Sequence, residues 1–398
     1  MAMTDRQTVR HTEKFGRRRA EILDVASIQI NEVGARGMTL TAVARALGID
    51  TSSVTYYFRR KEMLAAACLA RTLEWLRDRA VEAAALPTPA ARARRFLHAN
   101  IDLHRRQRTE SAPQLALLSD MRSLEGEPRA ALDAIYAEMF YIVRDYFAPL
   151  GRRPSLLACV TLINIVHWIP AWIDEYQTGD LPRVEERLFD LLASGLARGT
   201  WRVDGVPPAE VEHDDAQARF LHAATNLINR HGYHGASVER IAAELGVSTG
   251  SFYHHLENKN ELVIACFQRS FTLLDRAQAI GDEGGGSRGE QLARMLASIL
   301  ALQLGGDSPL LRTGAYQALP MDLRQQMLRR TAQVTRHVAG TVADGIADES
   351  LRAVDPVLAG HLVLSVINAA ADLRRWAARR PIETAVADMM EIVRVGIF

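Results

Sequence analysis

Two stretches with the same outline decide the fold: VSTGSFYHHLENKNEL at residues 247–262 and IDTSSVTYYFRRKEML at residues 49–64. In each, small polar residues are followed by an aromatic pair and then by a K-x-x-L pattern. The adjacent histidines His254 and His255 raise the question of a metal site. Neighbouring residues on a helix point about 100° apart and no third ligand lies nearby in sequence, so we predict no metal here.

The two stretches belong to a longer repeat. A shift of 198 positions (246 − 48, from Gly246 and Gly48) aligns residues 20–71 with residues 218–269 without a gap. The shared alanines and leucines recur at three- and four-residue steps, which predicts one apolar helix face, and shared glycines stand where helices should end. Cys68 pairs with Cys266, which favours two small core residues over thiol chemistry.

Each copy predicts the same series of helices. In the second copy, an amphipathic helix ends at Gly232, and a short helix follows that Ser237 should cap. After a turn come a further short helix, ending in aromatics, and a long fourth helix. Two short helices joined by a glycine turn are typical of a helix-turn-helix.

The composition agrees with two all-α domains. The chain has 398 residues, a formal net charge of +1 and three scattered cysteines, which predicts a reducing cytoplasm and confines any nucleic-acid contact to a local patch. The basic N-terminus lacks the apolar core of a signal peptide, so we expect a cytoplasmic protein. The apolar residues 155–173 are interrupted by Asn164, His167 and Pro170, which favours a buried or partner-facing helix over a membrane span.

Both copies resemble the DNA-binding domain of the tetracycline-repressor (TetR) family of bacterial regulators. The resemblance is carried by GYHGASVERIAAELGVSTGSFYHHLENKNEL at 232–262 and GARGMTLTAVARALGIDTSSVTYYFRRKEML at 34–64. The first copy departs from the pattern with Thr55 in place of the tyrosine found at Tyr253, and with Tyr57 in place of His255. The resemblance implies an all-α chain of two tandem TetR-like units, each a three-helix helix-turn-helix domain followed by a helical ligand-binding and dimerisation domain.

This organisation gives expected domain bounds: a basic N-terminal arm at 1–20, helix-turn-helix domains at 18–64 and 214–262, effector and dimerisation domains at 65–200 and 263–398, and a linker at 201–213. The arm, with Arg6, Arg10, Lys14 and Arg17 to Arg19, is either a solvated tail or a DNA-binding arm. GDEGGGSRG at 281–289 reads as a flexible loop, and residues 115–121 as a helix.

The candidate DNA-binding residues follow from the recognition helices. Small side chains at a helix N-terminus let it approach base edges, while tyrosine, histidine and lysine donate to phosphates. The resemblance implies that Tyr253 and Lys259 contact phosphate. Val54 and Phe58, with Phe252 and Leu256 in the second copy, should face the core. The candidates are Thr51, Ser52, Ser53, Thr55, Tyr56, Tyr57 and Lys61 in the first copy, and Thr249, Gly250, Ser251, Tyr253, His254, His255 and Lys259 in the second.

The helices behind each copy suit a small apolar effector, although aromatic residues at helical spacing are also ordinary core. The candidate lining residues are Tyr136, Trp168, Trp172, Tyr316 and Trp376. The expected partners are an operator in double-stranded DNA, the effector, and either the other half of the same chain, as a pseudo-dimer, or a second chain. The alternative is a helical ligand carrier or enzyme that keeps a repressor-like fold, but we find no Gly-rich phosphate loop, nucleophile elbow, HExxH motif or DxDxDG loop. We expect no cofactor.

Overall fold

The structure, a computed structural model, describes residues 2–109, 112–201, 203, 205–209, 216–246, 258–305, 309–312, 315, 319 and 321–398. Within these ranges the protein is helical and has no strand, apart from one isolated β-bridge between Ala197 and Leu351. The all-α prediction is confirmed. Expected contacts at Thr249, Gly250, Ser251, Tyr253, His254, His255 and Tyr316 lie outside the described residues, as do Phe252 and Leu256.

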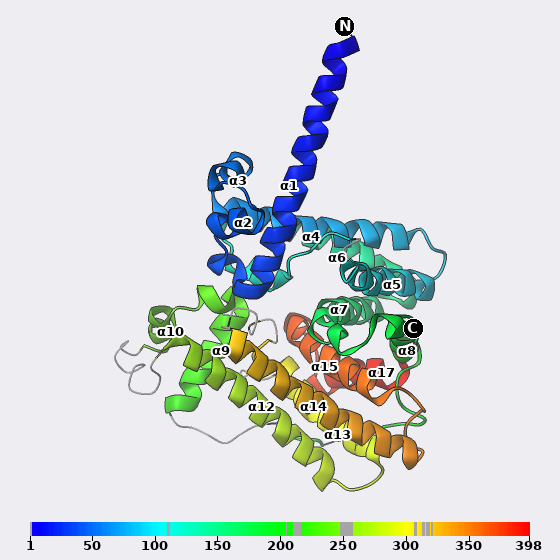
Figure 1. The fold of residues 1–398 in the computed structure, drawn as a ribbon. Helices are drawn as coiled ribbons and strands as arrows, with labels where there is room; N and C mark the ends of the chain where they lie inside the picture. Colours follow the sequence, from blue (N-terminus) through cyan, green and yellow to red (C-terminus); the bar gives the residue numbers. More distant parts are fainter. Residues whose placement is uncertain are drawn as a thin grey trace.

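Among its described residues, the first half has eight α-helices and several short 3₁₀ turns; Figure 1 shows how the helices are arranged. The helices are α1 (Ala2–Gly37), α2 (Leu40–Ala46), α3 (Thr51–Tyr57), α4 (Lys61–Ala84), α5 (Pro89–Gln107), α6 (Gly126–Tyr146), α7 (Arg152–Trp168) and α8 (Leu181–Ser194). The 3₁₀ turns are η1 (Leu118–Ser123), η2 (Ala148–Leu150), η3 (Ile169–Ala171), η4 (Ile173–Glu175) and η5 (Thr178–Asp180). The basic arm forms the outer part of α1, which projects from the rest of the protein in Figure 1.

The described helices of the second half are α9 (Ala216–Gly235), α10 (Val238–Leu245), α12 (Lys259–Glu283), α13 (Arg288–Gly305), α14 (Met321–Ala347), α15 (Pro356–Asp372), α16 (Arg374–Ala377) and α17 (Ile382–Val395). The repeat is visible in their geometry. Gly34 and Gly232 interrupt α1 and α9 with φ values of 74° and 71°. Cys68 and Cys266 are fully buried and donate to the carbonyls of Leu23 and Leu221, both at 3.7 Å, so their prediction as core residues is confirmed.

The two halves pack against each other through the helices that end each half. α15 packs on α7 and α8, and α17 packs on α8 (Figure 1). Ion pairs join Arg187 to Asp355 at 2.8 Å and Arg352 to Asp190 at 3.0 Å. The apolar core is continuous from the helices of the first half into the second half, whereas α1 to α3 and the start of α4 have a core cluster of their own.

The chain segments after α8 and α17 cross in close contact. Leu196 N–H donates to the Val393 carbonyl, and Ile397 N–H donates to the Leu192 carbonyl, both at 2.8 Å. Gly195 (φ 61°) and Gly396 (φ 96°) adopt left-handed backbone at this crossing. A side chain on either glycine would meet the backbone of the other segment, because no room is left for a Cβ atom.

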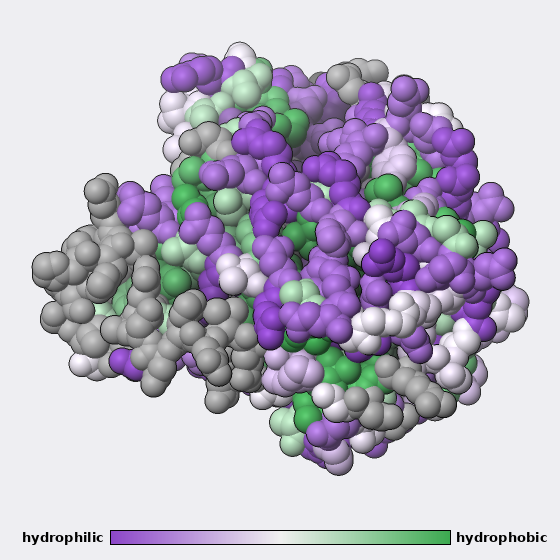
Figure 2. Space-filling view, turned by 90° about the horizontal axis from the view of Figure 1, so that it is seen from below, coloured by the Kyte–Doolittle hydropathy of each residue, from purple (hydrophilic) through white to green (hydrophobic). Residues whose placement is uncertain are grey.

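Most of the apolar stretch at residues 155–173 lies in α7. In the part of the chain that the structure describes, Pro154–Ala171 is long and apolar enough to cross a membrane by length and composition, and 67% of that window is buried. The helix packs between α6 and α15, which agrees with the predicted buried helix. Figure 2 shows the face below the view of Figure 1, where hydrophilic residues cover most of the surface and apolar residues form patches between them.

Two local predictions hold only in part, for the helix at 115–121 and the loop at 281–289. Residues 112–117 are not helical and lead into η1. Pro113 lacks an N–H group for a helix, and the backbone groups that follow bond instead to side chains of α1 and α4. Gln114 N–H donates to Asp24 on α1 at 3.0 Å, and Thr72 on α4 donates to the Ala116 carbonyl at 2.9 Å.

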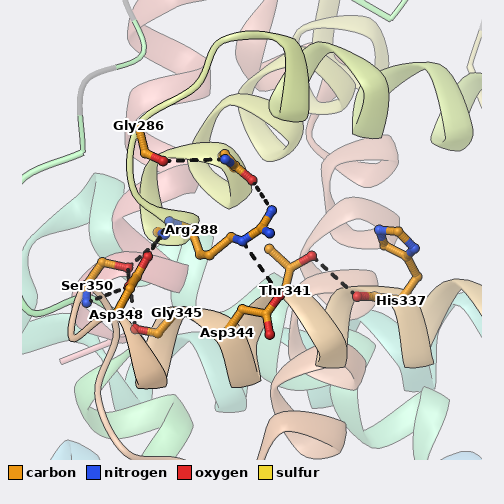
Figure 3. Close-up of polar contacts among 10 residues, drawn as sticks. Gly286, Arg288, His337, Thr341, Asp344, Gly345, Asp348 and Ser350 are labelled. Carbon is orange, nitrogen blue, oxygen red and sulfur yellow. Dashed lines mark hydrogen bonds and ion pairs between the residues drawn. The ribbon is translucent and has the colours of Figure 1, made fainter.

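The loop expected at 281–289 is shorter, because α12 runs to Glu283 and α13 begins at Arg288. The start of α13 is held by the turn after α14. Arg288 N–H donates to Asp348 at 2.8 Å (Figure 3), and Gly289 N–H donates to Ser350, also at 2.8 Å. These acceptors satisfy N–H groups that a helix N-terminus leaves free.

Candidate nucleic-acid interface and internal cavity

The first head, residues 18–64, forms a helix-turn-helix. Thr39 caps α2 by accepting a hydrogen bond from Ala42 N–H at 3.1 Å. The turn to α3 passes through Gly48, whose φ of 64° suits glycine. Val54 and Phe58 anchor α3 because they are buried in the head's core, as predicted.

The predicted contact residues on α3 differ in exposure. Ser52, Ser53, Thr55 and Tyr56 are exposed, and Thr51 and Tyr57 are half-buried. The Thr55 hydroxyl donates to the Thr51 carbonyl at 2.9 Å, which stabilises the helix from within. A row of small hydroxyl side chains beside an exposed tyrosine is compatible with a helix that enters a groove.

Aromatic residues form a cluster at the outer end of this head that the sequence did not predict. The ring of Phe15, on α1, lies 4.6 Å from the ring of Tyr57, and Tyr56 meets Tyr57 edge-on at 5.3 Å. Tyr56 is 70% exposed. The cluster fixes α1 against α3 while the Tyr56 side chain faces solvent.

Basic residues surround this surface. Lys14, Arg17, Arg45, Arg59 and Arg60 are exposed. Lys61, a predicted phosphate contact, is half-buried and donates to the Arg36 carbonyl at 2.6 Å, so it also caps the end of α1. Exposed positive side chains on the elements that flank a recognition helix are the electrostatic pattern of a nucleic-acid interface.

The second head is described on either side of residues 247–257. Ser237 caps α10 as predicted, accepting from Arg240 N–H at 3.2 Å, and Gly246 ends it in the left-handed conformation. Lys259 begins α12. Burial and the nearby charge of Arg36 lower the pKa of Lys259 to about 8, so this cation is less firmly protonated than an ordinary surface lysine.

A cavity of 590 Å³ lies between the two halves. Its wall comes from α4, α5, residues 114–122, α6 and α7 of the first half, and from α9, Arg312 and the end of α15 of the second. Tyr136 and Trp168, two predicted lining residues, form part of it. Trp172 lies outside it, stacked on His361 with ring centroids 4.6 Å apart, and Trp376 lies under Arg380.

The cavity wall mixes apolar and polar side chains, so the apolar pocket expected from sequence describes only part of it. His167 is surrounded by protein, but its side chain is accessible to solvent because it lines the cavity. Burial lowers the pKa values of His104 and His167 to about 4, and it raises the pKa of Tyr136. All three side chains are therefore neutral at pH 7.

Two asparagines join the heads to the cavity wall in the same way. Asn31, on α1, donates to the Leu115 carbonyl at 2.9 Å and accepts from Leu117 N–H at 2.8 Å. Asn229, on α9, donates to the Leu310 carbonyl and accepts from Arg312 N–H, both at 2.9 Å. Sequence reasoning missed these residues, although the repeat aligns Asn31 with Asn229 and could have identified them.

Hydrogen bonds also connect each half to the head of the other half. Arg324, on α14, donates to the carbonyls of Asn31 and Glu32 at 2.6 and 2.7 Å. Arg122, in η1, donates to the Asn229 carbonyl at 3.3 Å. Each head is therefore bonded both to a non-helical segment of its own half and to an arginine of the other half.

Comparisons with known proteins agree with the repeat. The family described as "Bacterial regulatory proteins, tetR family" matches residues 22–68 and 220–266. A fatty acid metabolism regulator protein of Bacillus subtilis (strain 168) is 24% identical over 159 residues, which are 38% of this chain and 78% of that protein. The HTH-type transcriptional regulator BetI of Burkholderia thailandensis is 37% identical over 87 residues, 21% of this chain and 45% of that protein.

Among solved structures, the transcriptional regulator FadR from Bacillus subtilis in complex with stearoyl-CoA matches 44% of this chain and 97% of its own, with 18% identity and a TM-score of 0.37.

Proposed function

This chain belongs to the TetR family of bacterial DNA-binding transcriptional regulators, and from that premise we propose that it is a one-component repressor released from its operator by a small effector. The family consists of regulators rather than enzymes, and the paired matches correspond to two tandem units. We assign DNA binding to the exposed face of α3 and to the equivalent residues 249–255, and effector binding to the cavity between the halves.

The paired asparagines carry the effector proposal. Asn31 and Asn229 hold backbone segments that line the cavity, and both belong to the first helix of a head. An effector that displaces residues 115–117 or 310–312 would thus shift α1 or α9. A ligand shifts the equilibrium between a DNA-binding and a released conformation only if its affinity differs between the two. Because these hydrogen bonds connect the cavity wall to α1 and α9, a ligand that moves the wall would favour one conformation over the other.

We also propose that one chain acts as an intramolecular pseudo-dimer in the cytoplasm. The contacts of α7 and α8 with α15 and α17, and the crossing at Gly195 and Gly396, support this arrangement. One chain would then present two heads to one operator. Because TSSVTYY and TGSFYHH carry different side chains, the operator should be an imperfect palindrome.

A gel-shift assay against DNA upstream of the protein's own gene tests the proposal. We expect a saturable shift at low salt, protection of two unequal half-sites, and a changed base preference at one half-site when Ser53→Ala is introduced. Glu82→Ala, on the solvent side of α4, is a matched control that should bind like the parent protein. A chain that shifts this DNA no better than unrelated DNA at every salt concentration would contradict the proposal.

A further inference from the structure

We propose that the cavity between the halves takes an amphipathic anion, with a carboxylate or phosphate group on Arg122 and an apolar body along the first-half wall. The inference rests on the proposed effector function and adds the chemical class of the ligand. It follows from the charges that line the cavity.

Each carboxylate in the cavity wall already has a cation. Asp133 pairs with Arg129 at 2.7 Å, Asp372 with Arg312 at 2.6 Å, and Asp174 with Arg108 at 2.9 Å. Arg122 remains. No carboxylate among the described residues lies within ion-pair distance of it, and its hydrogen bond goes to a neutral carbonyl, that of Asn229.

Arg122 keeps its charge although it lies deep in the protein. Burial and the charge of Arg312 lower its pKa to about 10, which leaves the guanidinium protonated at pH 7. Arg122, Arg312 and Asp372 together carry a formal charge of +1, and the nearby His167 and Tyr136 are neutral. A buried cation without a full counter-charge is costly, and a bound anion would offset that cost.

Guanidinium geometry favours carboxylate and phosphate, because its planar N–H groups can donate in parallel to two oxygen atoms. Only one hydrogen bond of Arg122 to a described residue is present, through Nη1. Within the described part of the chain nothing else accepts from this guanidinium, and we infer that its remaining N–H groups donate to the oxyanion of the ligand. The apolar body of the ligand would contact Trp75, Leu103, Val166 and Trp168, which line the same cavity. The cavity volume of 590 Å³ is ample for a small amphipathic molecule.

The test measures binding of decanoate, decyl phosphate, decan-1-ol and decylamine to the full chain by titration calorimetry, with tryptophan fluorescence as a second readout because Trp75 and Trp168 line the cavity. We expect the two anions to bind at least about tenfold more tightly than the alcohol, and the amine most weakly. The comparison of decanoate with decyl phosphate distinguishes the two head groups.

Arg122→Met should remove the preference for anions while leaving the affinity for decan-1-ol unchanged, and Arg122→Lys should retain part of the preference because it keeps the charge. Arg183→Met, at an exposed arginine paired with Asp180 away from the cavity, is the matched control and should bind like the parent. Equal affinities for the four probes, no binding of any of them, or a preference for anions that survives in Arg122→Met would overturn the inference.

Gel shifts run in parallel separate this inference from the proposed function. If the anions bind through Arg122 but DNA stays bound, the ligand assignment holds and release by an effector fails. If the protein binds DNA, and decan-1-ol releases it as readily as decanoate does, the proposed regulatory function is supported and the anion site is wrong.

Discussion

Gly195→Ala should destabilise the contact between the two halves by about 3 kcal/mol or more. Gly195 adopts φ 61° at the crossing of the two chain segments, and a Cβ atom there would collide with the backbone of Arg394 and Val395. Backbone with φ 61° and ψ −158° is essentially restricted to glycine and costs another residue about 1–3 kcal/mol. A collision with backbone adds strain that no rotamer change relieves. Thermal or urea unfolding measures the loss.

Gly396→Ala should have a similar effect, since a Cβ atom there would lie 2.5 Å from the Ala193 carbonyl. Gly179→Ala is the matched control: Gly179 lacks positive φ, and no other part of the described protein lies within 4 Å of the place that a Cβ atom would take. It should unfold within about 0.5 kcal/mol of the parent. If Gly195→Ala were as stable as Gly179→Ala, the crossing would not exist in solution.

Replacing Arg59 and Arg60 together with alanine should weaken DNA binding about 10-fold to 100-fold at low salt. Both side chains are exposed at the turn after α3, and each phosphate contact contributes about 0.9 to the slope of log affinity against log salt. We therefore expect the slope to fall by about 2. The loss should be nearly uniform across DNA sequences, because phosphate contacts carry no sequence information.

Phosphate affinity should be concentrated in the first head. The second is preceded by EVEHDD at 210–215 and has Lys259 where the first has Lys61, and the pKa of Lys259 is lowered to about 8 by burial and Arg36. Lys259→Ala should therefore change the slope of log DNA affinity against log salt concentration by less than Lys61→Ala does. Lys61→Ala also removes the bond to the Arg36 carbonyl, so its stability must be measured alongside. The double variant Arg152→Ala and Arg183→Ala replaces two exposed arginines on other elements and controls for net charge. If it lost as much DNA affinity as the Arg59 and Arg60 variant, a specific basic surface on the first head would be excluded.

The heads could be predicted from sequence because their structure is determined locally. Helix caps at Thr39 and Ser237, the glycine interruptions at Gly34 and Gly232, and the apolar positions Val54 and Phe58 depend on neighbours within one short stretch. The repeat at 198 positions then gave the same elements twice.

The cavity could not be predicted, because its polar wall is assembled from segments far apart in sequence. Arg122, in the first half, approaches the ion pair of Arg312 and Asp372 in the second half only when the halves pack. Within the first half, Asn31 bonds to Leu115 across 84 positions. Aromatic content alone also failed to separate Trp168, which lines the cavity, from Trp172, which stacks on His361 in the interface. These differences arise from packing of α7 against α15 rather than from any local pattern.

The stoichiometry of the DNA complex tests the central claim most directly. Sedimentation or native mass spectrometry, at nanomolar to micromolar protein, should give one chain of 44.1 kDa when free, and one chain per duplex when bound to an operator that holds both half-sites. Gly195→Ala should lower the fraction of this complex. Chains that are dimeric at every concentration, or two chains on each duplex, would contradict the claim that the two heads of a single chain read one operator.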